Sequence, residues 1–91
     1  MGEVTDTLRM KLERSFSPDK LDIVDESSRH AGHGGAREGG ESHFKVTIVS
    51  GAFSGLGRVE RQRRVYAALA EELAGPVHAL SVKALSPREQ S

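Results

Sequence analysis

The 91-residue sequence contains no cysteine and no tryptophan, and it has one tyrosine and three phenylalanines. Without a thiol the chain forms no disulfide, carries no thiolate nucleophile and cannot complete a cysteine-based zinc or iron–sulfur site by itself. Histidine is therefore the residue type that would bind a metal. Thirteen basic residues balance thirteen acidic ones, so any attraction to nucleic acid or anionic lipid must be local.

Long apolar runs are also absent. No apolar stretch approaches the length of about 18 residues that spans a bilayer, and the N-terminus leads directly into charged residues. These features predict a cytoplasmic protein with no membrane contact, formed as one small domain over residues 1–91. The sequence has no Walker loop and no nucleophile elbow, and nothing near Asp25 and Glu26 would complete a reaction. It therefore predicts a protein that is not an enzyme.

The spacing of apolar residues predicts three strands and two main helices. Near the N-terminus every fourth residue is apolar, which is typical of a helix with one buried stripe. The segment around Phe44 and Ile48 alternates as a strand with one dry face does. The expected elements are a helix over residues 4–16, strands over 21–25, 43–50 and 77–85, and a helix over 58–74.

The order of these elements predicts the topology. A helix that connects two neighbouring strands forms a right-handed crossover, which makes those strands parallel. Ser86, Pro87 and Glu89 match a helix start, with a serine cap and a glutamate in the third helical position. We therefore expect an α/β (α+β) fold of the order α-β-β-(turn)-α-β with a C-terminal helix stub, in which helices cover one face of a three-stranded sheet.

Three local predictions follow from glycine content and helical geometry. Residues 27–42 hold half of the ten glycines and predict an irregular loop, and residues 51–57 predict a turn with Phe53 and Leu56 directed inward. Within 58–74, one arc of the helix is expected to face the core. The residues of that arc are Val59, Val65, Tyr66, Leu69, Ala70 and Leu73.

Four histidines are the candidate metal ligands. His30 and His33 lie in the glycine-rich loop, where the two imidazoles either converge or remain solvated. His78 begins the last strand at the rim of the sheet, where an isolated histidine is commonly partly buried and bonded to a backbone carbonyl, and His43 is expected at the solvent or the edge of the core. Two or three imidazoles do not close a zinc site, so a metal would need ligands from another molecule, and histidine and thiolate together can hold a 2Fe-2S cluster.

Four arginines gather in the first turns of the long helix, at positions 58, 61, 63 and 64. This placement opposes the helix dipole, which favours acidic residues near the N-terminus. A pair between Glu60 and Arg64, four residues apart on a solvated face, explains one of them. Arg58, Arg61 and Arg63 remain, and the group as a whole predicts a local surface for phosphate or for an acidic partner.

Several motifs occur in a characteristic order over about Leu8 to Glu89. They are Asp25-Glu26-Ser27, His30, Ser42-His43-Phe44-Lys45-Val46, Phe53-Ser54-Gly55, Arg61-Gln62-Arg63-Arg64-Val65-Tyr66, Leu69-Ala70-Glu71-Glu72-Leu73 and Val77-His78-Ala79-Leu80-Ser81. Together they resemble the BolA family. The resemblance covers nearly the whole chain.

The resemblance implies a KH-like fold of type II topology, which agrees with the element order above. It also implies a partnership with a monothiol glutaredoxin of the Cys-Gly-Phe-Ser type, in which a 2Fe-2S cluster is shared through thiolates of the glutaredoxin and of glutathione. His78 would be one cluster ligand and His30 the second, with His33 an adjacent rival. The chain alone would hold no cofactor.

The same resemblance implies a second activity. Some BolA proteins act on transcription and cell morphology under stress, and residues 53–66 resemble a helix-turn-helix, so that Arg58, Arg61, Arg63 and Arg64 would meet DNA phosphates. The sequence departs from the family in carrying Gln62 where histidine is common, near the centre of the apolar arc. Gly55 and Gly57 are two residues apart, so the Gly-x-x-Gly loop of RNA-binding KH domains is absent.

Overall fold

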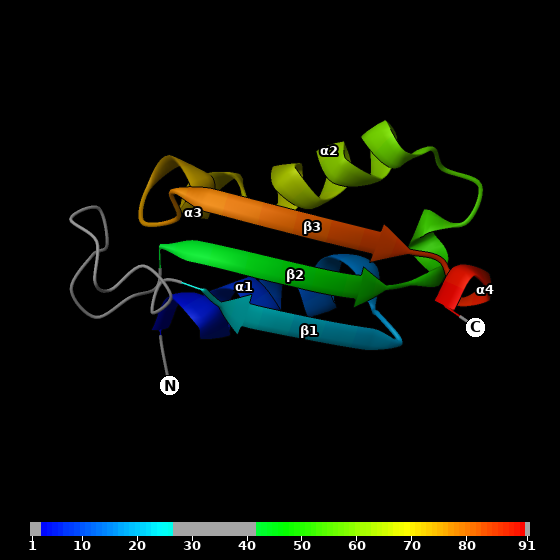
Figure 1. The fold of residues 1–91 in the computed structure, drawn as a ribbon, viewed down its shortest axis with the longest axis horizontal. Helices are drawn as coiled ribbons and strands as arrows, with labels where there is room; N and C mark the ends of the chain where they lie inside the picture. Colours follow the sequence, from blue (N-terminus) through cyan, green and yellow to red (C-terminus); the bar gives the residue numbers. More distant parts are fainter. Residues whose placement is uncertain (1–2, 27–41, 91) are drawn as a thin grey trace.

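The computed structural model describes residues 3–26 and 42–90, and its element order is the one expected except that two helices replace the one predicted over residues 58–74 (Figure 1). The elements are α1 (Glu3–Phe16), β1 (Lys20–Asp25), β2 (His43–Val49), the 3-10 turn η2 (Gly51–Phe53), α2 (Arg58–Ala68), α3 (Ala70–Ala74), β3 (Ala79–Leu85) and α4 (Pro87–Gln90). The predicted loop over residues 27–42 lies outside the described ranges, except for Ser42. No helix in the described ranges is long and apolar enough to cross a membrane.

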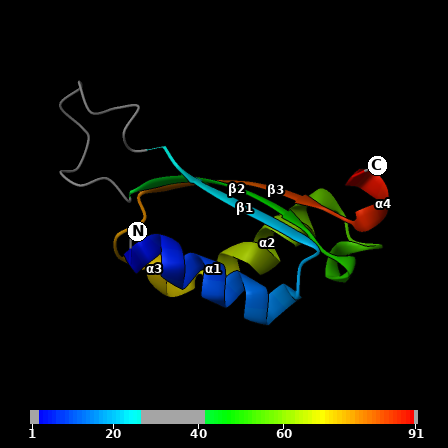
Figure 2. The same ribbon diagram turned by 90° about the horizontal axis from the view of Figure 1, so that it is seen from below.

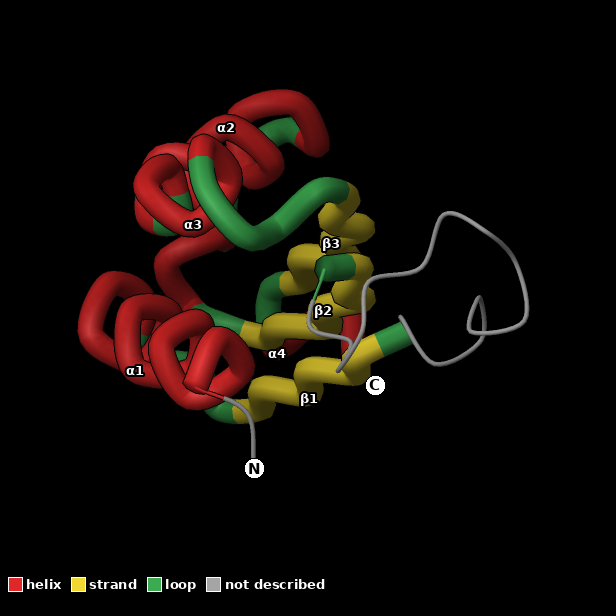
Figure 3. Tube along the Cα trace, turned by 90° about the vertical axis from the view of Figure 1, so that its left-hand side faces the viewer, coloured by secondary structure: helices red, strands yellow, loops and turns green. Residues whose placement is uncertain are grey.

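The three strands form one sheet in the order β1-β2-β3. β1 pairs antiparallel with β2, and β2 pairs parallel with β3, which confirms the predicted crossover. Figure 2 shows the sheet edge-on, with α1, α2 and α3 on one side of it. Figure 3 looks at the same two layers from the end of the sheet.

The core lies between the sheet and the helices, and β2 supplies its centre. The alternation read from the sequence is confirmed, because Phe44, Val46 and Ile48 are buried while Lys45 is exposed. Burial of such side chains contributes about 1.5–3 kcal/mol each. Phe53 is also buried, as predicted, and Leu56 is partly buried and packs against the core cluster. The buried core residues are Leu8, Leu12, Phe44, Val46, Ile48, Phe53, Val65, Leu69 and Val77.

The connection from α1 to β1 reverses the chain direction. Ser17 ends the helix in the left-handed conformation, with φ of 43°, and its N–H donates to the Glu13 carbonyl at 3.0 Å. The hydroxyl of buried Ser50 donates to the Phe16 carbonyl at 2.6 Å. The rings of Phe16 and Phe53 lie 5.0 Å apart. These contacts fix the end of α1 against the turn that follows β2.

The single helix expected over residues 58–74 is divided into α2 and α3. Leu69 leaves the helical conformation, with φ of −111° and ψ of 21°, and its N–H is shared between the Val65 and Tyr66 carbonyls. The bend directs the fully buried Leu69 side chain into the core. The prediction of one helix was wrong because neither glycine nor proline marks this position. A salt bridge from Lys11 to two glutamates of α3 holds α3 against α1.

The orientation of the predicted apolar arc was wrong in part. Val65 and Leu69 are buried and Leu73 is partly buried, but Val59 is 65% exposed, Tyr66 is 39% exposed and Ala70 is exposed. The reason is that α2 lies beside the outer edge of β3, so that one flank of the helix borders this edge. Periodicity identifies an apolar stripe but not how far a helix extends beyond the sheet that it covers.

Candidate functional site

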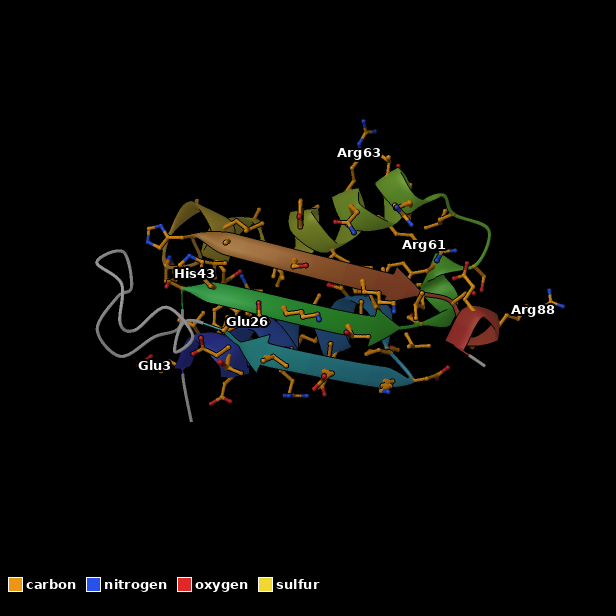
Figure 4. All side chains as sticks on the ribbon, viewed as in Figure 1. Glu3, Glu26, His43, Arg61, Arg63 and Arg88 are labelled. Carbon is orange, nitrogen blue, oxygen red and sulfur yellow. The ribbon has the colours of Figure 1, made fainter. Side chains whose placement is uncertain are left out.

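All three strands have a terminus at the same end of the sheet. Because β1 is antiparallel to β2 and β2 is parallel to β3, the carboxyl end of β1 meets the amino ends of the other two strands. Glu26 follows β1, its N–H donates to the His43 carbonyl at 2.7 Å, and His78 directly precedes β3. We call Glu26, Ser42, His43 and His78 the histidine rim, and Figure 4 labels two of these residues, Glu26 and His43.

His78 presents its side chain to solvent from a fixed backbone. Its N–H donates to the Ser42 carbonyl at 2.8 Å, and the preceding residue, Val77, is buried in the core. The strand predicted from residue 77 therefore begins at Ala79, with His78 at its approach. The imidazole is exposed, so a molecule that docks on this rim can reach it.

Ser42 links the starts of β2 and β3. It is fully buried, its carbonyl accepts the N–H groups of His78 and Ala79, and its hydroxyl lies 3.0 Å from Nδ1 of His43. His43 is consequently half-buried, at the edge of the core. Ser42 was quoted only as part of a family motif and was not predicted as a site residue; its place just before the alternating strand was a further signal.

His30 and His33 fall outside the described residues, and their part in the site stays a prediction. The described residues on either side of that segment, Glu26 and Ser42, both belong to the histidine rim. Over residues 3–26 and 42–90, no three histidine or acidic side chains come together in a way that could hold a metal ion. A metal bound at the described part of the rim would need further ligands.

The four arginines of α2 differ in their surroundings. Arg58 and Arg63 are exposed, and Arg63 points away from the sheet in Figure 4. Arg64 forms the predicted pair with Glu60 at 3.1 Å between Nε and Oε2. These three side chains lie at the surface, where a phosphate or carboxylate could contact them.

Arg61 is directed into the fold instead. Its side chain is 12% exposed, and it donates to the carbonyls of Leu56 at 2.9 Å and Ala84 at 3.1 Å and to the Glu89 carboxylate. The Glu89 carboxylate also accepts the Ser86 N–H at 2.8 Å, which confirms the predicted helix start. The Arg61 guanidinium lowers the pKa of Glu89 to about 2, helped by the Ser86 bond. Contact of Arg61 with DNA would require the loss of these bonds.

Two further side chains of α2 reach the outer edge of β3. Gln62 donates to the Val82 carbonyl at 2.8 Å, and Tyr66 donates to the Leu80 carbonyl at 3.2 Å. Gln62 is half-buried, as its place in the arc predicted. The glutamine thus satisfies a carbonyl on the side of β3 that pairs with no strand among the described residues.

The fold and site define a small α/β domain with an imidazole at one rim and a basic helix along one edge. A family model described as BolA-like protein matches residues 12–89. The chain therefore belongs to the BolA-like protein family.

Individual relatives of the chain are also BolA-like proteins. The human BolA-like protein 1 is 46% identical over 89 residues, which is 98% of this chain and 62% of the human protein. The chain thus spans less than two thirds of that relative. A Vibrio cholerae protein named DNA-binding transcriptional regulator BolA is 41% identical, with 94% of this chain and 77% of that protein covered. Among solved structures, the BolA domain of SufE1 from Arabidopsis thaliana has a TM-score of 0.86 at 42% identity, covering 98% of both chains.

Proposed function

We propose that this chain is a non-enzymatic partner of a monothiol glutaredoxin and shares a 2Fe-2S cluster with it, in the assembly, trafficking or sensing of iron–sulfur clusters. The observation that carries the proposal is the exposed imidazole of His78, fixed at the rim of a domain that has no thiol. Membership of the BolA-like family supports it. This chain has no cysteine and so provides no thiolate ligand, which means that the partner must supply the thiolates.

The chemistry of the rim suits this role. An imidazole nitrogen is an accepted ligand of a 2Fe-2S iron beside thiolates. The backbone of His78 is already held by the Ser42 carbonyl, so little backbone freedom would be lost when its side chain meets a bound group. The glutaredoxin and glutathione would give the thiolates, and His30 or His33 would give the second imidazole.

Co-expression with a Cys-Gly-Phe-Ser glutaredoxin tests the proposal. The expected product is a coloured heterodimer, whose visible absorption and circular dichroism change in the His78→Ala variant and whose cluster is lost faster. The melting temperature of the free variant should stay unchanged, because the side chain is exposed. A colourless mixture with the unaltered chain, or identical spectra for the variant, would reject this function.

The same preparation distinguishes the two candidates for the second ligand. His30→Ala and His33→Ala are matched controls for each other, because the residues are three positions apart in one segment. We expect the His30 variant to change the visible spectrum and the His33 variant to leave it unaltered. The reverse result would exchange the two assignments.

A second candidate function is DNA-binding transcriptional regulation of the response to stress and of cell morphology. It is favoured by the exposed Arg58, Arg63 and Arg64 on α2 and by the name of the Vibrio cholerae relative. These arginines are on a different element from the histidine rim, so the two functions do not exclude each other.

A further inference from the structure

A groove runs between α2 and the outer edge of β3, at the end of the sheet opposite the histidine rim. Its volume is about 680 Å³, and α4 borders one end of it. The residues that line this groove include Leu56, Arg58, Arg61, Val82, Lys83 and Leu85. His78 precedes β3, whereas the edge groove is lined by β3 from Val82 onward, four residues further along the strand and therefore about 13 Å away at about 3.3 Å per residue.

Apolar side chains lie exposed along α2, next to the edge groove. Val59 and Tyr66 are two of the four large apolar residues exposed among the described residues. They are two helical turns apart, about 10 Å along the axis. Arg63 lies between them in sequence and points outward. Tyrosine and arginine beside apolar surface are the residues enriched where proteins bind one another.

The same surface is basic. Arg58, Arg63 and Lys83 are exposed, and none of the three forms an ion pair within residues 3–26 and 42–90. The fourth cation, Arg61, already holds a carboxylate of this chain, that of Glu89. The charge left on the surface is therefore positive, which complements an acidic partner.

Addition of a partner strand to β3 is disfavoured. Its outward carbonyls at Leu80, Val82 and Ala84 accept hydrogen bonds from three side chains of α2. A new strand would have to displace those side chains. A helix satisfies its own backbone and can present apolar residues one and two turns apart to a groove, so it needs no such displacement.

We propose that the edge groove, with the flank of α2 that carries Val59, Arg63 and Tyr66, docks an acidic amphipathic helix of a partner protein. DNA would match the charge of this surface but would offer no apolar face to cover Val59 and Tyr66. The docking surface shares no residue with the histidine rim, so the proposal does not depend on cluster binding.

The test uses a synthetic helical peptide with leucines spaced to follow Val59 and Tyr66 and with glutamates on either side of them. Titration of the full chain is followed by backbone amide chemical shifts. We expect saturable shifts around Val59, Arg63 and Lys83, and none at the histidine rim. Arg63→Glu should weaken binding about tenfold, and Val59→Ser should weaken it several-fold. Arg14→Glu makes the same charge change on α1 and should leave affinity within about twofold.

Two comparison probes complete the experiment. The same peptide with lysine in place of glutamate should not bind, because it would repel the basic surface. A short DNA duplex should shift these residues less than the acidic peptide does. The proposal is overturned by equal binding of the lysine peptide, by tighter binding of the duplex at these residues, by equal effects of the Arg63 and Arg14 variants, or by no saturable binding of the acidic peptide.

Discussion

Arg61 and Glu89 are 28 positions apart in the sequence, and their side chains meet at 2.5 Å between Nη1 and Oε1. Because Arg61 also donates to the carbonyls of Leu56 and Ala84, one guanidinium joins the turn before α2, the end of β3 and α4. Arg61 is thus a structural residue of the fold, although it lies in the same short run as three surface arginines.

The first prediction compares Arg61→Ala with Arg63→Ala. Removal of Arg61 leaves the carbonyls of Leu56 and Ala84 without their charged donor. This loss should lower the free energy of unfolding by about 2 kcal/mol. Removal of Arg63, which is exposed on the same helix, should change it by less than about 0.5 kcal/mol. Urea denaturation followed by circular dichroism measures both values. Equal effects of the two variants would show that the Arg61 bonds do not contribute to stability.

The second prediction concerns acid. The Arg61 guanidinium holds the pKa of Glu89 at about 2, below its usual value near 4.5. A carboxyl group whose pKa is lower in the folded chain than in the unfolded chain stabilises the fold at any pH above the unfolded-state pKa. That stabilisation is lost as the pH falls from 4.5 towards 2. The melting temperatures of the unaltered chain and of Glu89→Gln should differ most above pH 5 and converge near pH 2. A difference in melting temperature that stays constant across this pH range would contradict the lowered pKa of Glu89.

Much of the fold could be predicted because it rests on local pattern. The alternation around Phe44 gave β2 and its buried face, and the Ser86 to Glu89 spacing gave α4 with its capping bonds. The crossover rule gave the parallel pairing of β2 and β3. The pair between Glu60 and Arg64 followed from their four-residue separation on a helix.

The features that could not be predicted depend on how the helices and strands pack together, and the local sequence pattern carries no information about that packing. No signal connects Arg61 to Glu89, so the sequence set apart only Arg64, by its pair with Glu60, and did not distinguish Arg61 as the arginine that is directed inward. The exposure of Val59 arises because α2 borders the edge of β3 rather than lying wholly over the sheet. In the site, the position of His78 at the rim was predicted, but its exposure was not, because an isolated histidine there was expected to be partly buried. The part-buried bond between Ser42 and His43 was not predicted either.

The third prediction tests the left-handed residue that ends α1. A serine with φ of 43° is strained because its Cβ approaches its own carbonyl oxygen, whereas glycine has no Cβ. Ser17→Gly should therefore raise the free energy of unfolding by about 0.5–1 kcal/mol. Ser15→Gly is the control, because residue 15 is helical and exposed, and it should lower stability. Thermal or urea unfolding of both variants measures the difference, and destabilisation by both would contradict the prediction.

The fourth prediction separates surface arginines from the internal one in DNA binding. If α2 contacts phosphates, the logarithm of the affinity for a DNA duplex should fall linearly with the logarithm of the salt concentration. Arg63→Ala should then reduce the slope by about one unit, because one phosphate contact releases about one counterion. Arg61→Ala, measured at a temperature where the variant is folded, should leave the slope unaltered because its guanidinium is bonded within the chain. Fluorescence anisotropy over a salt series measures both slopes. A slope that Arg63→Ala does not change, or affinity no higher than that of an unrelated basic peptide, would exclude α2 as a DNA-binding surface.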